Sequence, residues 1–338
     1  KLRTYSDNLH GVIFMSVESP LKFIFFWGLI IIPFLAGAIL NGRLVNPGKT
    51  AKTLINLNLS TLEPVILLWT IWGLKPEREL LILPLFGMLT VLTGFLIARL
   101  FTPLLKLDRI GRASYIISSS LSNQGMTMGG LLCFMVAGER GLALASIYII
   151  YYLPFVFAVI FPYAKISSLQ AQSPATVASF FTLRRLKSFF INFQNLPLAG
   201  IFFAVILQAA GIRRPVIYFP LEIFLSLAIA LYYLTLGINF KIGDLTSCKR
   251  ELAAISITRF ILIPAITLFI LQFTDFDKTI ELVILLQSFA PAAIYSVISS
   301  ILFGLDSRMT SGIFVMNSLI FLFCVMPLLM LFNDALVK

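Results

Sequence analysis

The chain has 338 residues, of which 59% are hydrophobic and 12% charged, and its formal net charge is +11. Soluble domains carry about 25% charged residues, so this composition excludes an ordinary soluble protein and favours helices embedded in a lipid bilayer. The apolar runs are too long for the strands of a membrane barrel. The basic residues stand in short loops rather than in a stripe with interleaved aromatic residues, so we expect no nucleic-acid partner.

The distribution of apolar residues predicts an N-terminal tail, 1–20, followed by ten membrane-spanning helices. The approximate bounds of these spans are 21–42, 53–74, 80–105, 113–137, 141–163, 189–211, 218–240, 250–273, 279–303 and 309–332. A polar stretch, 164–187, separates the first five spans from the last five. We therefore predict an all-α membrane protein whose two halves of five helices are joined by a linker.

The two halves share landmark residues at a nearly constant spacing along the chain. The matched pairs are Pro33 with Pro197, Gly73 with Gly237, Pro162 with Pro327, and Gly138 with Gly304. Several landmarks at one spacing predict an internal repeat. Because each half has an odd number of spans, the second half must be inverted in the membrane relative to the first.

The loops on the linker side of the predicted spans hold more basic residues than the loops on the other side. We count fourteen Lys and Arg residues on the linker side and ten on the other, terminal segments included. Basic loops face the cytoplasm, so we expect the linker 164–187 to be cytoplasmic and both termini to lie outside. The predicted location is the plasma membrane or the bacterial inner membrane.

Glu63 stands inside the second predicted span, directly before Pro64. An ionisable residue inside a span is costly and is by default a functional candidate. A carboxyl group there could bind a proton and couple proton movement to transport. The alternative is a hydrogen-bonded structural glutamate beside a proline kink.

Polar and small residues interrupt the fourth and ninth predicted spans, at 118–130 and 286–296. Irregular backbone at membrane depth is tolerated only where protein buries it or where it lines a water-filled cavity. Paired interruptions in the two halves of an inverted repeat point to the substrate site of a transporter. We therefore expect the two breaks to face each other near the middle of the membrane.

Each break leaves N–H groups without a helical partner at the start of its second half-helix, where the helix dipole adds about half a positive charge. Two such ends that converge predict a site for an anion such as a carboxylate. The candidate substrate-binding residues are Asn123, Gln124, Gly125, Gln287, Ser288, Pro291, Ala292, Tyr295 and Ser296. The alternative is that these residues only allow helices to pack closely.

Two arginines stand within predicted spans. Arg99, in the third span, can extend to the interface. Arg259, in the eighth span, lies deeper and could attract an anionic substrate toward a vestibule. Four asparagines also lie within spans, and this pattern does not assign their faces: Asn56, Asn58, Asn239 and Asn317.

The chain lacks the residue sets of membrane-embedded enzymes. Its aspartates lie in loops or the tail, its single histidine is His10 in the tail, and it has no GxxxxGK[ST] loop. This inventory excludes an intramembrane protease of the aspartyl or Ser–His kind, histidine-based metal binding in the membrane and ATP hydrolysis by this chain. We expect no enzymatic activity, no cofactor and no metal.

Four segments together resemble the auxin efflux carrier family, which includes plant auxin exporters and bacterial permeases. These segments are Ser122-Asn123-Gln124-Gly125, Gly138-Glu139-Arg140-Gly141-Leu142-Ala143, Asn195-Leu196-Pro197-Leu198-Ala199-Gly200-Ile201, and Ala290-Pro291-Ala292-Ala293 with the later Met326-Pro327-Leu328. The resemblance extends from about residue 25 to residue 332.

The resemblance implies ten helices in two inverted five-helix repeats, with broken and crossing helices 4 and 9. It also implies a scaffold domain, often a dimerising one, and a transport domain that moves in an elevator-like manner. In this chain the scaffold would comprise 21–75 and 188–241, and the transport domain 76–163 and 249–333. Asn123 and the backbone around Pro291 would hold a substrate carboxylate.

Two features depart from the family pattern. Gly130-Leu131 stands where family members often carry a proline, and the linker is short, so auxin itself is not indicated as the substrate. The resulting prediction is a secondary transporter of a small organic anion, with proton or sodium coupling and a homodimer left open. The alternatives are a sodium-coupled symporter of the bile-acid type and a membrane sensor that binds a ligand without moving it.

Overall fold

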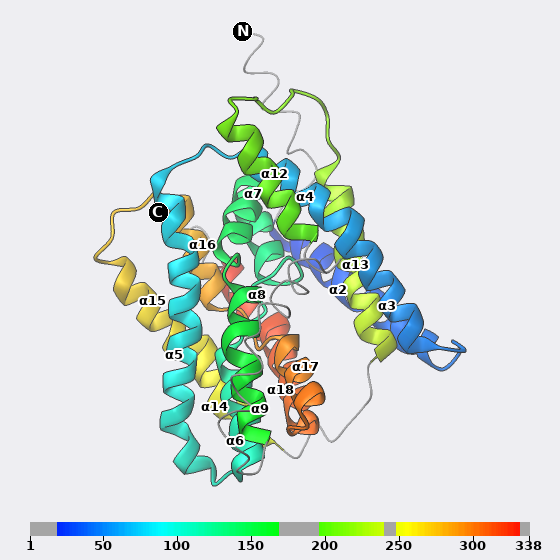
Figure 1. Ribbon diagram of the computed structural model, residues 1–338, viewed down its shortest axis with the longest axis vertical. Coiled ribbons are helices and arrows are strands. Elements are labelled where there is room, and N and C mark those ends of the chain that lie inside the picture. Colours follow the sequence, from blue (N-terminus) through cyan, green and yellow to red (C-terminus); the bar gives the residue numbers. More distant parts are fainter. Residues whose placement is uncertain (1–18, 169–195, 240–247, 332–338) are drawn as a thin grey trace. The chain divides into compact units, whose positions relative to one another are not determined.

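The computed structural model describes residues 19–168, 196–239 and 248–331 (Figure 1). All regular structure in these three ranges is helical. The predicted tail 1–20 and linker 164–187 lie almost entirely outside the described residues.

The predicted class, a helical multi-pass membrane protein, agrees with the lengths and composition of the described helices. Six helical runs are long and apolar enough to cross a membrane: Pro47–Trp72, Arg78–Leu105, Gly129–Tyr148, Leu221–Ile238, Lys249–Leu271 and Ser307–Leu329. Three apolar stretches of 10–17 residues are Leu196–Ala209, Ile294–Phe303 and Trp27–Asn41, the last being the C-terminal part of the longer helix Ser19–Asn41. Neither the fourth nor the ninth predicted span is one continuous helix, and Gly129–Tyr148 joins the end of the fourth to the start of the fifth through a bend. The count of ten spans stays a prediction.

The chain divides into two compact units. The first unit contains α2 (Ser19–Asn41), α3 (Pro47–Leu57), α4 (Glu63–Trp72), the segment Phe134–Ala143, α12 (Leu196–Ala209) and α13 (Leu221–Asn239). The second unit contains α5 (Ile82–Leu105), α6 (Arg109–Ser120), the two ends of α7 (Gly129–Tyr148), α8 (Tyr152–Phe155), α9 (Phe161–Ser168), α14 (Lys249–Ile257), α15 (Ile263–Leu271), α16 (Lys278–Ser288), α17 (Ile294–Phe303), α18 (Ser307–Ile320) and α19 (Met326–Leu331).

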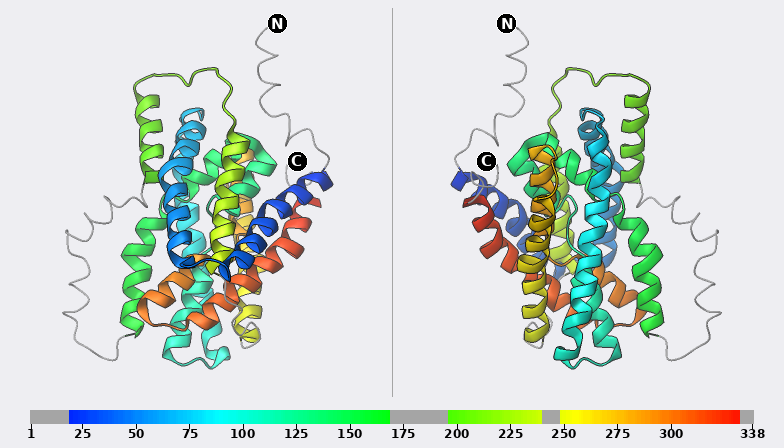
Figure 2. Two further views of the ribbon diagram at one scale, coloured as in Figure 1. Left: turned by 90° about the vertical axis from the view of Figure 1, so that its right-hand side faces the viewer. Right: turned by 90° about the vertical axis from the view of Figure 1, so that its left-hand side faces the viewer.

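In the first unit, α2 packs against α13 and α4 packs against α12 (Figure 2). A β-carbon at Gly37 would overlap the carbonyl oxygen of Leu234, and one at Gly237 would overlap that of Phe34. The two helices therefore approach backbone to backbone at a reciprocal pair of glycines, as close-packed membrane helices do.

Four helical runs within the described ranges contain a π-helical turn, which adds one residue to the local repeat and is frequent at functional sites. These turns are Asn58–Leu62, Val156–Ile160, Thr258–Leu262 and Phe321–Val325. Asn58 is fully buried, and its Nδ2 donates to the carbonyl oxygen of Ala228 at 2.8 Å. The turn at Thr258 carries Arg259 and the turn at Asn58 ends directly before Glu63, so two candidate residues lie at widened turns.

In the second unit, aspartates fix the starts of three helices. The carboxylates of Asp108, Asp277 and Asp306 accept hydrogen bonds from backbone N–H groups in the first turns of α6, α16 and α18. The core of this unit contains two clusters of buried apolar residues. Ala292 belongs to one cluster, and Leu121 and Ala293 to the other, so the two interrupted segments lie within the core.

Candidate functional site

Both predicted breaks are non-helical segments in the second unit. Helix α6 ends at Ser120 and α7 begins at Gly129, which leaves 121–128 outside the helices. Helix α16 ends at Ser288 and α17 begins at Ile294, which leaves 289–293 outside. Each half-helix therefore ends or begins inside the fold, where its backbone groups need other partners.

The two segments supply those partners to each other. The N–H of Asn123 donates to the carbonyl oxygen of Pro291 at 2.7 Å, and the N–H of Ala293 donates to the carbonyl oxygen of Leu121 at 3.0 Å. Ser122 and Ala292 form the antiparallel bridge between these two bonds. The segments therefore cross as a short, strand-like pair in the core.

The first break also satisfies the start of its own second half-helix. The N–H of Gly129 donates to the carbonyl oxygen of Asn123 at 3.2 Å, and that of Gly130 donates to the carbonyl oxygen of Gly125 at 2.8 Å. The expectation that the N–H groups at this helix start are free is therefore wrong for these two glycines. An anion at this end of α7 would meet the helix dipole, but it needs hydrogen-bond donors from elsewhere.

The second break is held by an asparagine from another helix. The Oδ1 of Asn317, in α18, accepts a hydrogen bond from the N–H of Ala292 at 2.8 Å. The Nδ2 of Asn317 donates to the Oγ of Ser256, in α14, at 3.1 Å. Asn317 is fully buried, so it ties three segments together in the core. The sequence had left this residue unassigned, although an asparagine in a span is a signal for such a role.

Several of the predicted site side chains are already hydrogen-bonded. The half-buried Asn123 accepts at its Oδ1 from the Oγ1 of Thr127 at 3.0 Å. The hydroxyl groups of Ser288 and Ser296 donate to carbonyl oxygens one turn earlier, those of Leu285 at 2.6 Å and Ala293 at 2.7 Å. The two serines therefore brace the helix ends, and each keeps only an acceptor capacity for a ligand.

Gln124 joins the first break to the second through a buried polar network. Its Nε2 donates to the Oγ1 of Thr90 at 3.2 Å and, at 3.4 Å, to the carbonyl oxygen of Gln287. Its Oε1 accepts from the Tyr151 hydroxyl at 3.0 Å, and Thr90 shares a hydrogen bond of 3.2 Å with the Tyr148 hydroxyl. Thr90 and these tyrosines were not predicted from the sequence, although two tyrosines near an interrupted span are a usable signal.

Gln287 presents a side-chain amide without protein partners. The residue is fully buried, and neither Nε2 nor Oε1 has a hydrogen-bond partner among the described residues. A β-carbon at Gly129 would overlap the Gln287 Oε1, so this amide lies against the first residue of α7. A buried amide without partners costs about 1–3 kcal/mol, which a polar ligand would recover. Tyr295 also lies in this unit, with its ring 5.7 Å from that of Tyr152.

Arg259 lies in the π-helical turn between α14 and α15 and is fully buried. Its electrostatic neighbours are three tyrosines, Tyr148, Tyr151 and Tyr152. Its Nε and Nη2 have no hydrogen-bond acceptor in the described part of the chain. The sequence placed this arginine where it could attract an anion toward a vestibule, whereas the structure buries it completely.

Glu63 belongs to the first unit, where it begins α4 and is half-buried. The side chain of Tyr232, in α13, hydrogen-bonds its carboxyl group. The neighbouring Pro64 lies against Gly200 of α12, whose β-carbon position would overlap the Pro64 carbonyl oxygen. Glu63 is therefore held between close-packed helices, where a change in its protonation alters a buried contact.

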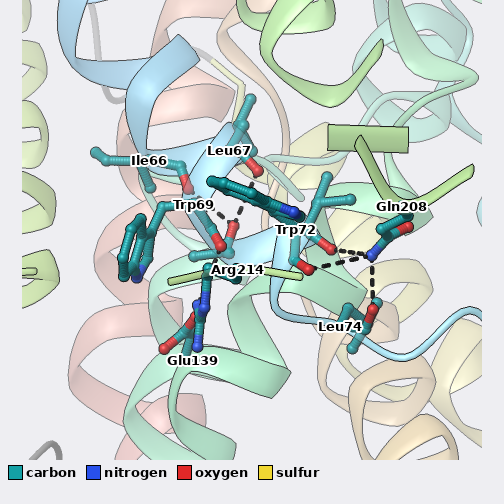
Figure 3. A network of polar contacts seen from close by, with 10 residues as sticks. Ile66, Leu67, Trp69, Trp72, Leu74, Glu139, Gln208 and Arg214 are labelled. Atoms are coloured by element: carbon teal, nitrogen blue, oxygen red, sulfur yellow. Dashed lines mark hydrogen bonds and ion pairs between the residues drawn. The ribbon is translucent and has the colours of Figure 1, made fainter. Parts of the chain in front are cut away.

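The first unit contains a second polar network, which the sequence analysis missed (Figure 3). The Nη1 of Arg214 donates to the carbonyl oxygen of Trp69 at 3.1 Å and to the carboxylate of Glu139. The guanidinium lies 4.8 Å from the centre of the Trp69 ring. Nearby, the Nε2 of Gln208 donates to the carbonyl oxygens of Ile71 and Leu74, each at 2.6 Å.

This network adds side-chain donors at the C-terminal end of α4, where the carbonyl oxygens of Trp69 and Ile71 also accept from the backbone N–H groups of Gly73 and Leu74. A cation is favourable at that end because of the helix dipole, and Arg214 provides it. Glu139 follows Gly138, where the backbone of α7 has a positive φ of 60°. The ion pair therefore fastens the bend in α7 to the end of α4, although the three segments are far apart in sequence.

A family model described as "Membrane transport protein" matches residues 28–330, almost the whole chain. No curated protein matches the chain.

Proposed function

The chain belongs to this family of membrane transport proteins, the auxin efflux carrier family, and we propose that it moves a small organic anion, specifically a carboxylate, across the bilayer. Members of the family are transporters and not enzymes. The membership and the long apolar helices make this an integral membrane protein with several spans. The substrate class, its site and the mechanism are our proposals.

The crossing of the two breaks is the observation that carries this proposal. Two backbone hydrogen bonds, from Asn123 to Pro291 and from Ala293 to Leu121, hold the crossing within the core. Irregular backbone at membrane depth is tolerated where protein buries it or where it lines a cavity, and paired breaks in the two halves of a transporter mark the substrate site. The buried amide of Gln287 and the dipole of α7 offer donors and positive potential to a carboxylate, and Asn123 is half-exposed beside them.

An inverted repeat of ten helices is the architecture we propose around this crossing. In support, Gly138 and Gly304, one of the landmark pairs of the two halves, both have a positive φ, 60° and 65°. The π-helical turns Val156–Ile160 and Phe321–Val325 are separated along the chain by almost the same number of residues as these two glycines. Irregularities repeated at one spacing are expected when two halves share a fold.

The transport step we propose is an elevator-like movement of one domain against a scaffold. The scaffold would comprise 21–75 and 188–241, and the moving domain 76–163 and 249–333. In support, the crossing and its polar network belong entirely to the second compact unit, while α2, α4, α12 and α13 belong to the first. The segment Phe134–Ala143 groups with the first unit, so a boundary of the moving domain would fall within α7.

We further propose that the linker 164–187 is cytoplasmic, that both termini lie outside, and that the scaffold could support a homodimer. Coupling to protons would involve Glu63. Sodium coupling is the competing reading, and it lacks an acidic residue beside either break in the sequence.

Reconstituted liposomes test the proposal. Purified protein is incorporated into liposomes, and the flux of radiolabelled acetate and benzoate is measured against acetamide and benzamide, under sodium and pH gradients applied separately. We expect carboxylate flux that responds to pH and not to sodium. A sodium requirement would establish the symporter reading instead, and binding of carboxylates without any flux would contradict transport.

A further inference from the structure

Arg259 is the one fully buried arginine in the described part of the chain, and it has no carboxylate partner there. A buried guanidinium normally pairs with an acid because removal of its charge from water is costly. The electrostatic neighbours of Arg259 are hydroxyl-bearing residues, Tyr148, Tyr151 and Tyr152. The protein therefore holds an uncompensated positive charge inside the second unit.

The two unpaired donors of Arg259 have a definite geometry. Nε and Nη2, which lack acceptors among the described residues, form one edge of the planar guanidinium. Their N–H bonds are parallel, and this edge matches the two oxygens of a carboxylate in a bidentate pair. A spherical anion such as chloride cannot engage both donors with the same geometry.

A third unpaired group belongs to the same cluster. The Tyr152 hydroxyl is buried and has no hydrogen-bond partner in the described ranges. Tyr152 is one of the three tyrosines near Arg259, and the centre of its ring lies 5.7 Å from that of Tyr295. Tyr295 is one of the predicted substrate-binding residues, so the cluster around Arg259 reaches the second break.

The cluster also reaches the first break. Tyr151 acts on Arg259 electrostatically and donates its hydroxyl hydrogen to the Oε1 of Gln124, the residue after Asn123. The amide hydrogens of Gly129 and Gly130, which could have bound an anion, already have acceptors within the break. A carboxylate at the crossing therefore lacks those backbone donors, and Arg259 is the fully buried cation of the same unit.

We propose that Arg259 is the charge partner of the substrate: its Nε–Nη2 edge binds the carboxylate in a bidentate pair, and the Tyr152 hydroxyl donates a further hydrogen bond. The ligand class is a monocarboxylate with a single negative charge. This inference rests on the proposed transport of an organic anion. It assigns recognition of the negative charge of the substrate to a side chain rather than to helix ends alone.

The test uses the purified full chain in detergent and follows the thermal unfolding midpoint as each probe is added. A ligand that binds the folded state raises this midpoint, and the stabilisation grows with the logarithm of the ligand concentration divided by Kd. The probes are sodium acetate and sodium benzoate, with acetamide, benzamide and sodium chloride as controls. The variants are Arg259→Met, Arg259→Lys and Tyr152→Phe. Arg99→Met, at an exposed arginine of the same unit, is the matched control.

We expect the carboxylates to stabilise the wild-type protein and the Arg99→Met variant, and their amides and chloride to have no effect. Arg259→Met should abolish the stabilisation. Arg259→Lys keeps the positive charge but loses the two parallel N–H donors, and Tyr152→Phe loses the hydroxyl donor. Each should weaken carboxylate binding about tenfold. Without ligand, Arg259→Met should melt at the wild-type temperature or higher, because it removes an unpaired buried charge.

Carboxylate stabilisation that persists in Arg259→Met would overturn this inference and leave the proposed transport intact. Stabilisation by chloride equal to that by acetate would overturn the carboxylate assignment. An absence of stabilisation by either carboxylate in the wild-type protein would count against both proposals. If Arg259→Met does not fold, the Arg259→Lys and Tyr152→Phe variants test the inference. Wild-type affinity for the carboxylates in both variants would refute the bidentate pair.

Discussion

The backbone N–H of Asn123 donates a hydrogen bond of 2.7 Å to the carbonyl oxygen of Pro291, and this bond joins the two interrupted segments of the chain. Pro291 has no N–H and cannot return the bond, so the second link between the segments comes from Ala293 to Leu121. Because both links are made by backbone atoms, the crossing does not depend on the Asn123 side chain. That side chain can be changed to test function separately from folding.

Asn123→Ala should reduce carboxylate flux strongly and lower stability by no more than about 1 kcal/mol, because it removes only the bond from Thr127. Flux in liposomes and the thermal unfolding midpoint are the two measurements. Thr127→Val is the matched control, since it removes the same bond and keeps the asparagine. Equal loss of flux in both variants would assign the effect to that bond and argue against a substrate contact.

Gly129→Ala should destabilise the protein by about 1–3 kcal/mol, because the new β-carbon would overlap the Gln287 side chain and the backbone of Gln124. Gly125→Ala, earlier in the same break, is the control, since a β-carbon there meets nothing within 4 Å. Thermal unfolding of both variants provides the comparison. Similar midpoints for the two would show that α7 does not start against Gln287.

Asn317→Ala should cost about 1–3 kcal/mol and should lower flux, because it leaves the buried N–H of Ala292 without an acceptor. Ser256→Ala removes only the acceptor of the Asn317 Nδ2 and should cost less. Both variants can be compared by thermal unfolding and liposome flux. A larger effect at Ser256 would mean that Asn317 serves α14 rather than the second break.

Arg214→Met should destabilise the protein by about 1–3 kcal/mol, because it removes the cation from the end of α4 and from the face of Trp69. Glu139→Gln should cost less than about 1 kcal/mol, since the pair is partly exposed and solvent screens it. A double-mutant cycle on the unfolding midpoints measures the coupling. Arg140→Met, whose 3.9 Å contact with Glu77 is exposed, should have no measurable effect.

Glu63→Gln should flatten the dependence of flux on pH, because glutamine mimics the protonated carboxyl group at every pH. The variant should therefore transport at neutral pH as the wild-type protein does at low pH. Liposome flux between pH 5 and pH 8 is the measurement. Tyr232→Phe keeps the carboxyl group and removes its hydrogen-bond partner, so the profile should shift without flattening. An unchanged profile in Glu63→Gln would leave this residue with a structural role.

The sequence was sufficient to predict the helical class, the family and the positions of the two breaks. Helix breakers act locally, so Pro291 and the polar run around Asn123 mark the breaks without knowledge of the fold. The hydropathy pattern also marks apolar spans, although it could not decide how many remain continuous. The family match over 28–330 agrees with the resemblance seen in the short segments.

The contacts that give the site its chemistry could not be predicted from local pattern. The acceptor of the Asn123 N–H, the Pro291 carbonyl, lies in the other half of the chain, and Arg214 likewise pairs with a distant residue, Glu139. Burial of Arg259 depends on the helices packed around it. Its position within a span therefore could not show whether its side chain faces a vestibule or the protein interior. The N–H groups of Gly129 and Gly130 were expected to be free. In the structure the break folds so that two of its carbonyl groups accept from them, and this local fold has no simple sequence signature.

The buried charge of Arg259 has a consequence for membrane voltage. One elementary charge that crosses the full membrane field exchanges about 2.3 kcal/mol per 100 mV. In the proposed elevator step, a domain that carries Arg259 with its carboxylate moves no net charge at this site, whereas the empty domain moves one positive charge. The membrane potential would therefore drive or oppose the return of the empty carrier, and the direction of net transport would follow from voltage as well as from the substrate gradient.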